Sequence, residues 1–195
     1  MPKKATTNIE KKLTDAALKL AARREWNLLT LEEIARTAKL PLAQVKKLFP
    51  GTDAILPAIV GSMDAQTAAA FGKAGPQGAP HDRLFEVMMA RFDALQEHRR
   101  AILGIIASAR RNPKLARPLL PAQLQAMEKM LTLARLKPGG PAAPLAAAGL
   151  LAVYAFALCS WRGDNSSDMA KTMAALDRAL RHAGKAAEIL FRAVK

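Results

Sequence analysis

The sequence predicts an all-α protein of about nine helices, and three observations support this fold class. Ala, Leu, Lys and Arg are abundant, and these side chains lose little rotamer freedom in a helix. Apolar residues recur at spacings of three and four, as on one face of a helix. No segment alternates apolar and polar residues in the manner of a half-buried strand. We therefore expect helices joined by short loops.

A first amphipathic helix is predicted over residues 9–25, because its apolar positions recur with the helical period. Asn8 precedes it and is a suitable N-cap. The segment from Thr30 to Glu33 then has the sequence of a capping box, in which each of the two side chains bonds to the backbone amide of the other residue. This pattern predicts a short helix over residues 31–38.

A second short helix is predicted from Pro41 to Phe49, after a tight connection. Pro41 is expected at its first position, where the missing N–H costs no hydrogen bond. Val45, Leu48 and Phe49 are expected to be buried. Two short helices joined by a tight turn form a helix-turn-helix, whose second helix lies in the major groove of DNA. The alternative is an ordinary helical hairpin without a function in binding.

Polar and small side chains on the outer side of this second helix are candidates for DNA contact. Gln44 can form a bidentate pair with adenine, and lysines bind phosphates or guanine. The start of the next helix, at Thr52, offers free backbone amides to another phosphate. The predicted DNA-contacting residues are Thr30, Leu42, Ala43, Gln44, Lys46, Lys47 and Thr52.

Further helices are predicted in the rest of the chain, separated by Gly and Pro. The Gly- and Pro-rich residues 71–80 indicate a flexible connection. The expected helices cover residues 52–70, 82–95 with Asp82 as the cap, 98–111, 121–134, 145–161 and 166–183, and a basic amphipathic segment, 185–195, ends the chain. The uncharged helix over 145–161 is at the short limit of a membrane span, and its many alanines favour a buried helix of a soluble protein.

Large apolar residues on these later helices are candidates for a ligand pocket. Flexible Met side chains adapt well to an apolar ligand. An ordinary packed core is the alternative explanation for each residue. The predicted pocket residues are Met88, Met89, Phe92, Met127, Met130, Tyr154, Leu158 and Trp161. Small residues at Ala152, Ala155 and Ala157 would allow close helix approach in a four-helix dimer interface.

The charge of the chain is strongly basic. The 195 residues carry 30 Lys and Arg against 16 Asp and Glu, a formal net charge of +14. Such a charge indicates a polyanionic partner, namely nucleic acid, an anionic membrane surface or an acidic protein. The alternative is a basic bias that serves only solubility. One cysteine excludes an internal disulfide and fits a reducing compartment, so we expect a cytoplasmic protein.

The basic residues are not confined to the helix-turn-helix. The net charge is +5 over residues 1–56 and +9 over residues 57–195. One basic cluster of the second part is not required by operator binding and would suit anionic lipid or an acidic partner, unless it is an ordinary solvated face. It comprises Arg99, Arg100, Arg110, Arg111, Lys114 and Arg117.

No pattern of a catalytic or metal site stands out. His81, His98 and His182 are far apart in the sequence, and Cys159 lies within an apolar helix, where thiols are usually inert. The sequence has no zinc-protease, paired-cysteine or P-loop motif. We therefore expect a protein that is not an enzyme and needs no cofactor or metal.

The apolar pattern of the N-terminal residues is that of a known DNA-binding domain. It is formed by Leu13, Ala16, Ala17, Leu20, Thr30, Ile34, Ala35, Ala38, Leu40, Val45, Phe49, Pro50, Ala54, Ile55 and Leu56. It resembles the TetR-type transcriptional regulators over about the first 60 residues. This resemblance implies a homodimer that binds operator DNA through residues 1–56. It also implies that residues 57–195 form a helical domain for dimerisation and for a small regulatory ligand.

The chain departs from the TetR pattern at four positions. Pro41 stands where Ser or Thr usually precedes the recognition helix, and Lys46 stands where an aromatic residue usually contacts the DNA backbone. Leu48 replaces a common His or Tyr, and Thr52 replaces a common Lys that reaches a phosphate. Lys46 and Lys47 are able to restore phosphate contacts, whereas Leu48 is not.

A second resemblance covers most of residues 84–183. Its most specific part runs from Trp161 to Arg178 and includes the run Asp164 to Asp168. This part is similar to the Coq-nine family, lipid-binding accessory proteins of ubiquinone biosynthesis that share the TetR fold. The resemblance implies a lipid pocket, no DNA reading, and membrane contact through a C-terminal amphipathic helix, which residues 185–195 would provide. The alternative for that segment is a helix packed on its own domain.

Overall fold

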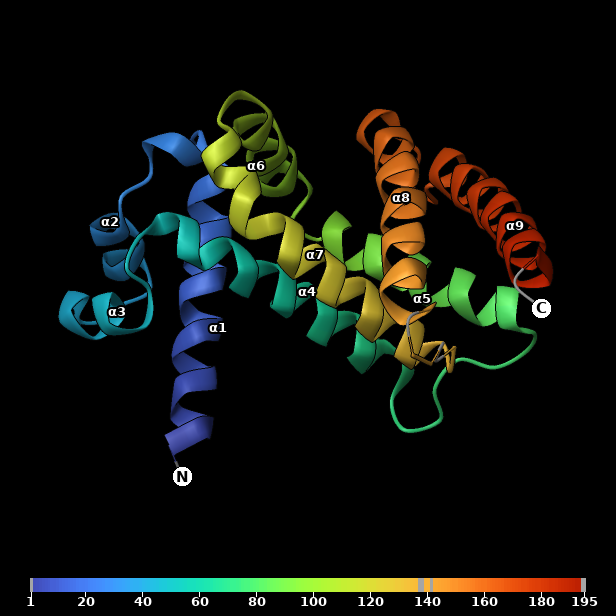
Figure 1. The fold of residues 1–195 in the computed structure, drawn as a ribbon. Coiled ribbons are helices and arrows are strands. Elements are labelled where there is room, and N and C mark those ends of the chain that lie inside the picture. The colour runs from blue at the N-terminus through green and yellow to red at the C-terminus, as the bar shows by residue number, and fades with distance from the viewer. Residues whose placement is uncertain (1, 137–138, 141, 194–195) are drawn as a thin grey trace. The chain divides into compact units, whose positions relative to one another are not determined.

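Helices make up almost all of the regular structure in the computed structural model, which describes residues 2–136, 139–140 and 142–193, with side chains from residue 7 to residue 185. The described residues form nine α-helices, two short 3-10 helices and no strand (Figure 1). The elements are α1 Pro2–Ala21, η1 Trp26–Leu28, α2 Leu31–Thr37, α3 Leu42–Leu48, η2 Thr52–Ala54, α4 Ile55–Phe71, α5 Pro80–Gln96, α6 Arg99–Arg111, α7 Pro113–Leu133, α8 Ala142–Gly163 and α9 Ala170–Ala193. The predicted all-α class is confirmed.

The chain groups into two compact units. The first unit comprises Met1–Gln66 and Asp93–Ala122, and the second comprises Thr67–Phe92 and Gln123–Lys195. Every predicted DNA-contacting residue therefore belongs to the first unit, and every predicted pocket residue belongs to the second. The division into functional domains at residue 56 stays a prediction.

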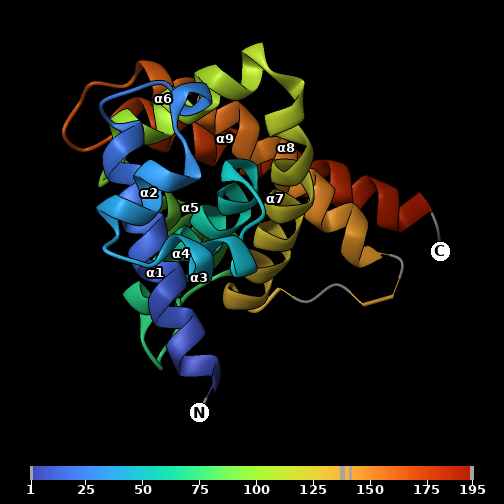
Figure 2. The same ribbon diagram turned by 90° about the vertical axis from the view of Figure 1, so that its left-hand side faces the viewer.

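The first unit is built around α1. Its buried face carries Leu13, Ala17 and Leu18, and α1 contacts both α2 and α6, while α2 contacts α3 (Figure 2). Gly104 of α6 faces this helix, since a Cβ added there would lie 3.4 Å from the carbonyl oxygen of Ala21. The missing side chain lets α6 pack closely on the end of α1.

Local hydrogen bonds fix both ends of α2. Thr30 accepts a hydrogen bond from the Glu33 N–H at 3.2 Å, and the Glu33 carboxylate accepts one from the Thr30 N–H at 3.1 Å. The predicted capping box is confirmed. At the other end, Lys39 has a left-handed φ of 56°, and the Leu40 N–H donates to the Ala35 carbonyl. This helix-ending turn redirects the chain into α3.

Replacing Thr30 by Ala is expected to lower the free energy of unfolding by about 1 kcal/mol, because the amides at the start of α2 lose their acceptor. Urea denaturation followed by circular dichroism measures the change. Thr30→Ser keeps the hydroxyl and serves as the control. Equal stability of Thr30→Ala and the parent protein would show that the capping box does not stabilise the unit.

Three predictions about the N-terminal helices are wrong. Asn8 lies inside α1, which begins at Pro2, and asparagine is only mildly unfavourable within a helix. Pro41 is the N-cap of α3 with extended backbone angles, so Leu42 is the first helical residue. Leu48 is 38% exposed. It lies four residues after Gln44 on the outer face, whereas Val45 and Phe49 share the buried face.

The later helices are longer than the sequence predicts. α5 begins at Pro80, so Asp82 lies in its first turn and does not cap it. α7 begins at Pro113 and continues through Pro118 and Pro121, although each proline removes one N–H from the helix. α9 continues past Ala183 to Ala193, so the predicted C-terminal segment is not a separate helix. Its side chains after residue 185 lie outside the described residues.

In the second unit, α8 packs on α9, and arginines hold the loop that precedes α5. Arg83 donates to the carbonyl of Ala134 at 2.8 Å, and Arg135 donates to the carbonyl of Ala74 at 2.7 Å. The first bond joins α5 to the end of α7, and the second joins the loop after α4 to the end of α7. The predicted glycine-rich connection therefore has specific contacts in the structure.

Candidate nucleic-acid interface and ligand-binding unit

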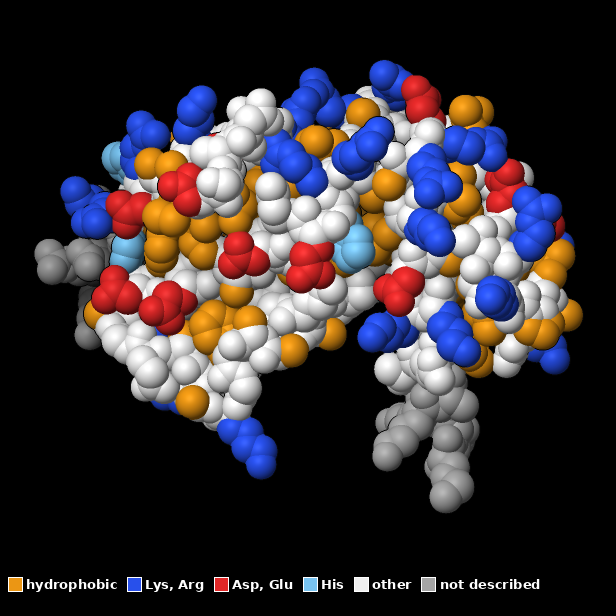
Figure 3. Space-filling model, turned by 180° about the vertical axis from the view of Figure 1, so that it is seen from behind, with side chains coloured by type: hydrophobic (Ala, Val, Ile, Leu, Met, Phe, Trp, Pro, Cys, Tyr) orange, Lys and Arg blue, Asp and Glu red, His pale blue; other side chains and the backbone are white. Residues whose placement is uncertain are grey.

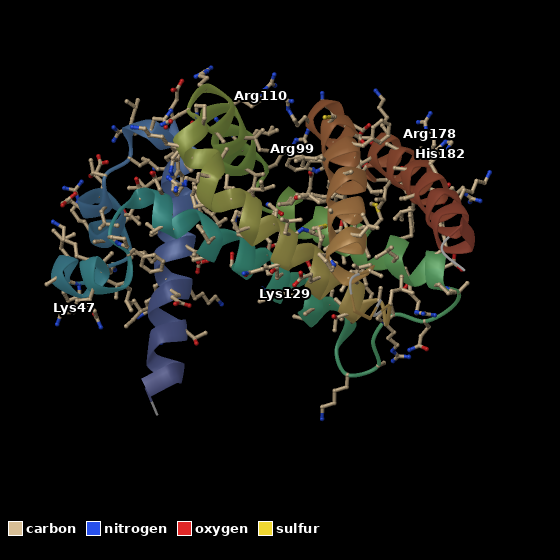
Figure 4. The ribbon with its side chains drawn as sticks, viewed as in Figure 1. Lys47, Arg99, Arg110, Lys129, Arg178 and His182 are labelled. Atoms are coloured by element: carbon tan, nitrogen blue, oxygen red, sulfur yellow. The ribbon has the colours of Figure 1, made fainter. Side chains whose placement is uncertain are left out.

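The outer face of α3 presents the side chains that the sequence predicts for DNA contact. Ala43, Gln44, Lys46 and Lys47 are exposed, and Leu42 is half-buried. Lys47 points away from the rest of the first unit (Figure 4). Val45 and Phe49, on the opposite face, are buried and fix the orientation of the helix. The structure thus brings these residues together on one open surface.

An ion pair joins α3 to α2. The Lys46 ammonium lies 3.1 Å from the Glu32 carboxylate. The backbone amide of Glu32 and the Lys46 side chain together lower the pKa of that carboxyl. Lys47 has no ion pair with any described residue, and it is therefore free to meet a phosphate.

The two predicted threonines lie in different surroundings. The Thr30 hydroxyl is occupied by the capping box of α2. Thr52 is half-buried at the start of η2, and its hydroxyl lies 3.5 Å from the Asp53 carboxylate. A negative charge therefore stands beside Thr52, where the sequence predicts a phosphate contact.

The first unit also contains a cleft that the sequence did not predict. Its volume is about 470 Å³, and it lies between α1 and the turn that joins α5 to α6. Side chains of both charges line it: Asp15 and Glu97 are acidic, and Lys19 and Arg100 are basic. None of the predicted pocket residues is among its lining residues. The lining residues come from two segments, 15–22 and 96–101, and no sequence pattern indicates that these segments lie together.

The predicted pocket residues form a buried apolar group in the second unit. Six of the eight are buried and Met89 and Leu158 are half-buried. The Phe92 ring lies 5.5 Å from the Tyr154 ring and 6.5 Å from the Trp161 ring, measured between centroids. The structure therefore brings α5 and α8 together at these three rings. An apolar ligand would have to enter among these side chains.

A charged side chain, Arg91, lies within the same buried group. It is almost completely buried, its guanidinium lies 5.4 Å from the centre of the Tyr154 ring, and it donates to the Gln123 side chain at 3.2 Å. The cation–π contact and the amide acceptor help to offset the cost of removing this charge from water. Sequence reasoning did not include Arg91 in the pocket. The sequence feature that could have indicated it is the position of a charged residue on the apolar face of the helix predicted over residues 82–95.

A buried carboxylate joins α8 to α9. Asp164 follows α8 and is almost completely buried. It accepts hydrogen bonds from the hydroxyl and the N–H of Ser166 and from the hydroxyl and the N–H of Thr172, the latter two at 2.8 Å. These donors, the Ser166 hydroxyl first, hold the pKa of Asp164 well below its usual range.

The outer face of α8 corrects the prediction of a buried helix. Leu145 is 60% exposed and Phe156 is 52% exposed, and Ala152 and Ala155 are exposed beside them. Ala157, predicted with these alanines at a helix interface, lies on the buried face instead. Among the described residues, α9 packs on α8, and Phe92 of α5 contacts Tyr154 and Trp161 on its buried face.

The structure gives two further findings about site classes. Within the described residues, no group of three or more His, Cys, Asp or Glu side chains is placed to hold a metal ion. Two segments, Thr52–Phe71 and Ala142–Gly163, are long and apolar enough to cross a membrane by length and composition. Core helices of soluble proteins satisfy the same criterion.

No protein-family model matches the chain, and no curated protein matches it. Solved structures do match. A TetR transcriptional regulator from Nitrosomonas europaea is 20% identical with a TM-score of 0.71, and the match covers 90% of this chain and 97% of that chain. A TetR transcriptional regulator from Rhodococcus sp. is 16% identical with a TM-score of 0.66, over 92% of this chain and 97% of the other.

A third match has a more specific description. The TetR family repressor AlkX from Dietzia sp., implicated in biodegradation of n-alkanes, is 15% identical with a TM-score of 0.58, over 90% of this chain and 95% of the other. The likeness of residues 84–183 to the Coq-nine family stays a resemblance, because no family model matches. Each of the three matched structures covers nine tenths or more of this chain, from the helix-turn-helix into the later helices. The chain therefore has the fold of the TetR-type transcriptional regulators.

Proposed function

We propose that this chain is a TetR-type DNA-binding transcriptional regulator, which acts as a homodimer and is controlled by a small apolar ligand. The outer face of α3 is the observation that supports this function best. Gln44 and Lys47 are exposed there, on a helix whose other face is fixed by buried Val45 and Phe49. A short, anchored helix with an open polar face suits the major groove.

Each side chain of α3 has a distinct task in this proposal. Gln44 reads an adenine through two hydrogen bonds, one from its amide group and one to its carbonyl oxygen. Lys46 and Lys47 bind phosphates on either side of the groove. Because phosphate binding releases condensed counterions, operator affinity falls steeply as the salt concentration rises.

A second copy of the chain would cover the outer face of α8. That face is apolar, and α8 carries no charged residue before Arg162. Met173 of α9 is also exposed and extends the apolar surface. Two protomers joined here form a four-helix interface and present two α3 helices to successive major grooves, about 34 Å apart.

The regulatory ligand would bind among the Met and aromatic residues of the second unit. Flexible methionines such as Met88, Met127 and Met130 adapt to apolar ligands, and all three are buried. The description of AlkX, implicated in n-alkane biodegradation, supports an apolar ligand. The ligand changes operator affinity only if it binds the DNA-competent and DNA-incompetent states with different affinities.

This function places the protein in the cytoplasm, without a cofactor or a catalytic step. No comparison and no contact of the described residues favours the lipid-binding accessory function of the Coq-nine type. Membrane contact through residues 185–195 is therefore not part of the proposal.

Selection from a pool of random DNA duplexes tests the proposal, because it finds the operator and the affinity in one experiment. The purified protein is expected to enrich a two-fold symmetric sequence, and its affinity for that sequence should exceed that for scrambled DNA. Equal affinity for both at every salt concentration would contradict operator binding.

Replacing Gln44 by Ala is expected to relax the preference at one base pair of each half-site by about 1–3 kcal/mol, because the bidentate contact is lost. Competition binding with single-base operator variants measures this preference. Gln125→Ala, an exposed glutamine of α7 in the second unit, is the matched control. A uniform loss of affinity on all sequences would show that Gln44 does not read a base.

A further inference from the structure

A second basic surface lies in the first unit, where α6 ends and α7 begins. We call it the α6–α7 patch, formed by Arg110, Arg111, Lys114 and Arg117, and all four residues are exposed. The sequence has no Asp or Glu from residue 98 to residue 127, so no carboxylate nearby in the sequence neutralises these charges. Arg110 points outward from α6 (Figure 4).

Contacts within the protein account for only part of this patch. Arg111 pairs with Glu25 at 3.1 Å, whereas Arg110, Lys114 and Arg117 have no ion pair among the described residues. Arg110 and Arg111 lie in the last turn of α6, where the helix dipole favours positive charge. Lys114 lies in the first turn of α7, where the dipole disfavours positive charge, and Arg117 lies in the second turn, beyond the reach of the dipole. The last two therefore gain nothing from their own helix.

The patch is joined to the helix-turn-helix by two ion pairs within the first unit. Arg111 binds Glu25 just before η1, and the adjacent Arg24 binds Glu33 at 2.7 Å. Glu33 in turn belongs to the capping box of Thr30 at the start of α2. Figure 3 shows Lys and Arg side chains, with some Asp and Glu side chains among them, on the first unit at the right of the view. Ion pairs and the adjacent residues Arg24 and Glu25 thus link the patch to the start of α2 within the first unit.

We propose that the α6–α7 patch binds the phosphate backbone of DNA that flanks the major groove contacted by α3. This inference rests on the proposed function and extends it to a second contact on the same duplex. DNA is favoured over a membrane surface because the patch lies in the unit that holds α3. Leu28 on η1 and Leu120 on α7 are isolated exposed apolar side chains of the elements next to the patch and form no apolar face. Surface binding to a membrane needs an apolar face as well as charge.

The patch acts by charge alone in this proposal. Guanidinium and ammonium groups bind phosphates without reading the sequence, so the patch adds affinity for flanking DNA of any sequence. Each phosphate contact contributes about 0.9 to the slope of log affinity against log salt concentration. Loss of three contacts per protomer therefore lowers that slope measurably.

The test compares the full chain with a triple variant, Arg110→Gln, Lys114→Gln and Arg117→Gln. A second triple variant, Lys73→Gln, Lys171→Gln and Arg178→Gln, removes three exposed charges from the second unit and is the matched control. Both variants are titrated with two DNA duplexes. The trimmed duplex holds only the specified bases of the selected operator, and the flanked duplex adds random sequence of about one helical turn on each side. Salt slopes are measured for every pair, and circular dichroism melting confirms that each variant is folded.

We expect the salt slope of the patch variant on the flanked duplex to fall by about 0.9 for each lost contact, with little change on the trimmed duplex. Arg110→Lys with Arg117→Lys keeps the charge and should keep the slope. Slopes equal to those of the control on both duplexes would overturn the inference. Failure of the wild-type chain to select any sequence would instead overturn the proposed function. A patch variant that matches the control on DNA but loses binding to phosphatidylglycerol vesicles would identify a membrane surface and also overturn the inference.

Discussion

Replacing Phe156 by Glu is expected to convert the proposed dimer into monomers, with a rise in the dimer dissociation constant of at least about 100-fold. Phe156 is 52% exposed and lies on the outer face of α8, a helix that carries no charged residue before Arg162. A two-fold interface buries it twice, and each burial contributes about half of the 1.5–3 kcal/mol of a fully exposed side chain, because half of Phe156 is already covered. The introduced carboxylates would also be buried without a cationic partner on that face, which adds to the cost.

Sedimentation over a range of protein concentrations measures this dissociation. Leu120→Glu places the same charge on an equally apolar and exposed residue outside α8 and α9, and it should leave the dimer intact. Operator affinity of Phe156→Glu should fall as well, because a monomer reaches only one half-site. An undiminished dimer for Phe156→Glu would place the interface elsewhere.

Replacing Asp164 by Asn is expected to destabilise the second unit by more than the loss of the Thr30 cap destabilises the first. The carboxylate accepts four hydrogen bonds from Ser166 and Thr172 in a buried position. An amide has one acceptor oxygen, and its NH2 group would face donors. The change therefore leaves buried donors unpaired at the link between α8 and α9. Thermal melting monitored by circular dichroism measures the loss, and Asp15→Asn on the exposed surface of α1 is the control.

The same substitution is expected to change the pH dependence of stability. The pKa of Asp164 is lowered in the folded state, so its contribution is fully present above the unfolded pKa near 4 and is lost as the pH falls below it. Glu33 and Asp177, whose pKa values are lowered by Thr30 and Arg181 respectively, contribute with the same sign. The parent protein should therefore lose stability steeply in acid, and Asp164→Asn should lose it less steeply. Parallel acid profiles for the two proteins would contradict this role.

Asp93 affects the pH dependence of stability in the opposite direction. Burial raises the pKa of its carboxyl, so its charged form is disfavoured in the folded state at neutral pH. Protonation of Asp93 therefore favours folding as the pH falls. The acid loss expected for the parent protein is the sum of these opposed contributions.

The sequence by itself determined the features that depend on residues within one or two turns. The capping box of Thr30 and Glu33 and the buried positions Val45 and Phe49 follow from spacings of three and four residues. These local rules were enough to predict the helix-turn-helix and the all-α class. They also placed Gln44 and Lys47 on an open face, because the buried positions of α3 leave them on the other side.

Only the tertiary structure decided which face of each helix meets another element and which meets solvent. The nearly continuous apolar sequence of α8 does not say that one face stays open, and a charge on the apolar face of α5 does not say that Arg91 lies against Tyr154. The ion pair between Arg111 and Glu25 likewise joins residues 86 positions apart. Burial and ion pairing depend on partners that are distant in the sequence. Local propensity carries no information about those partners until the chain is packed.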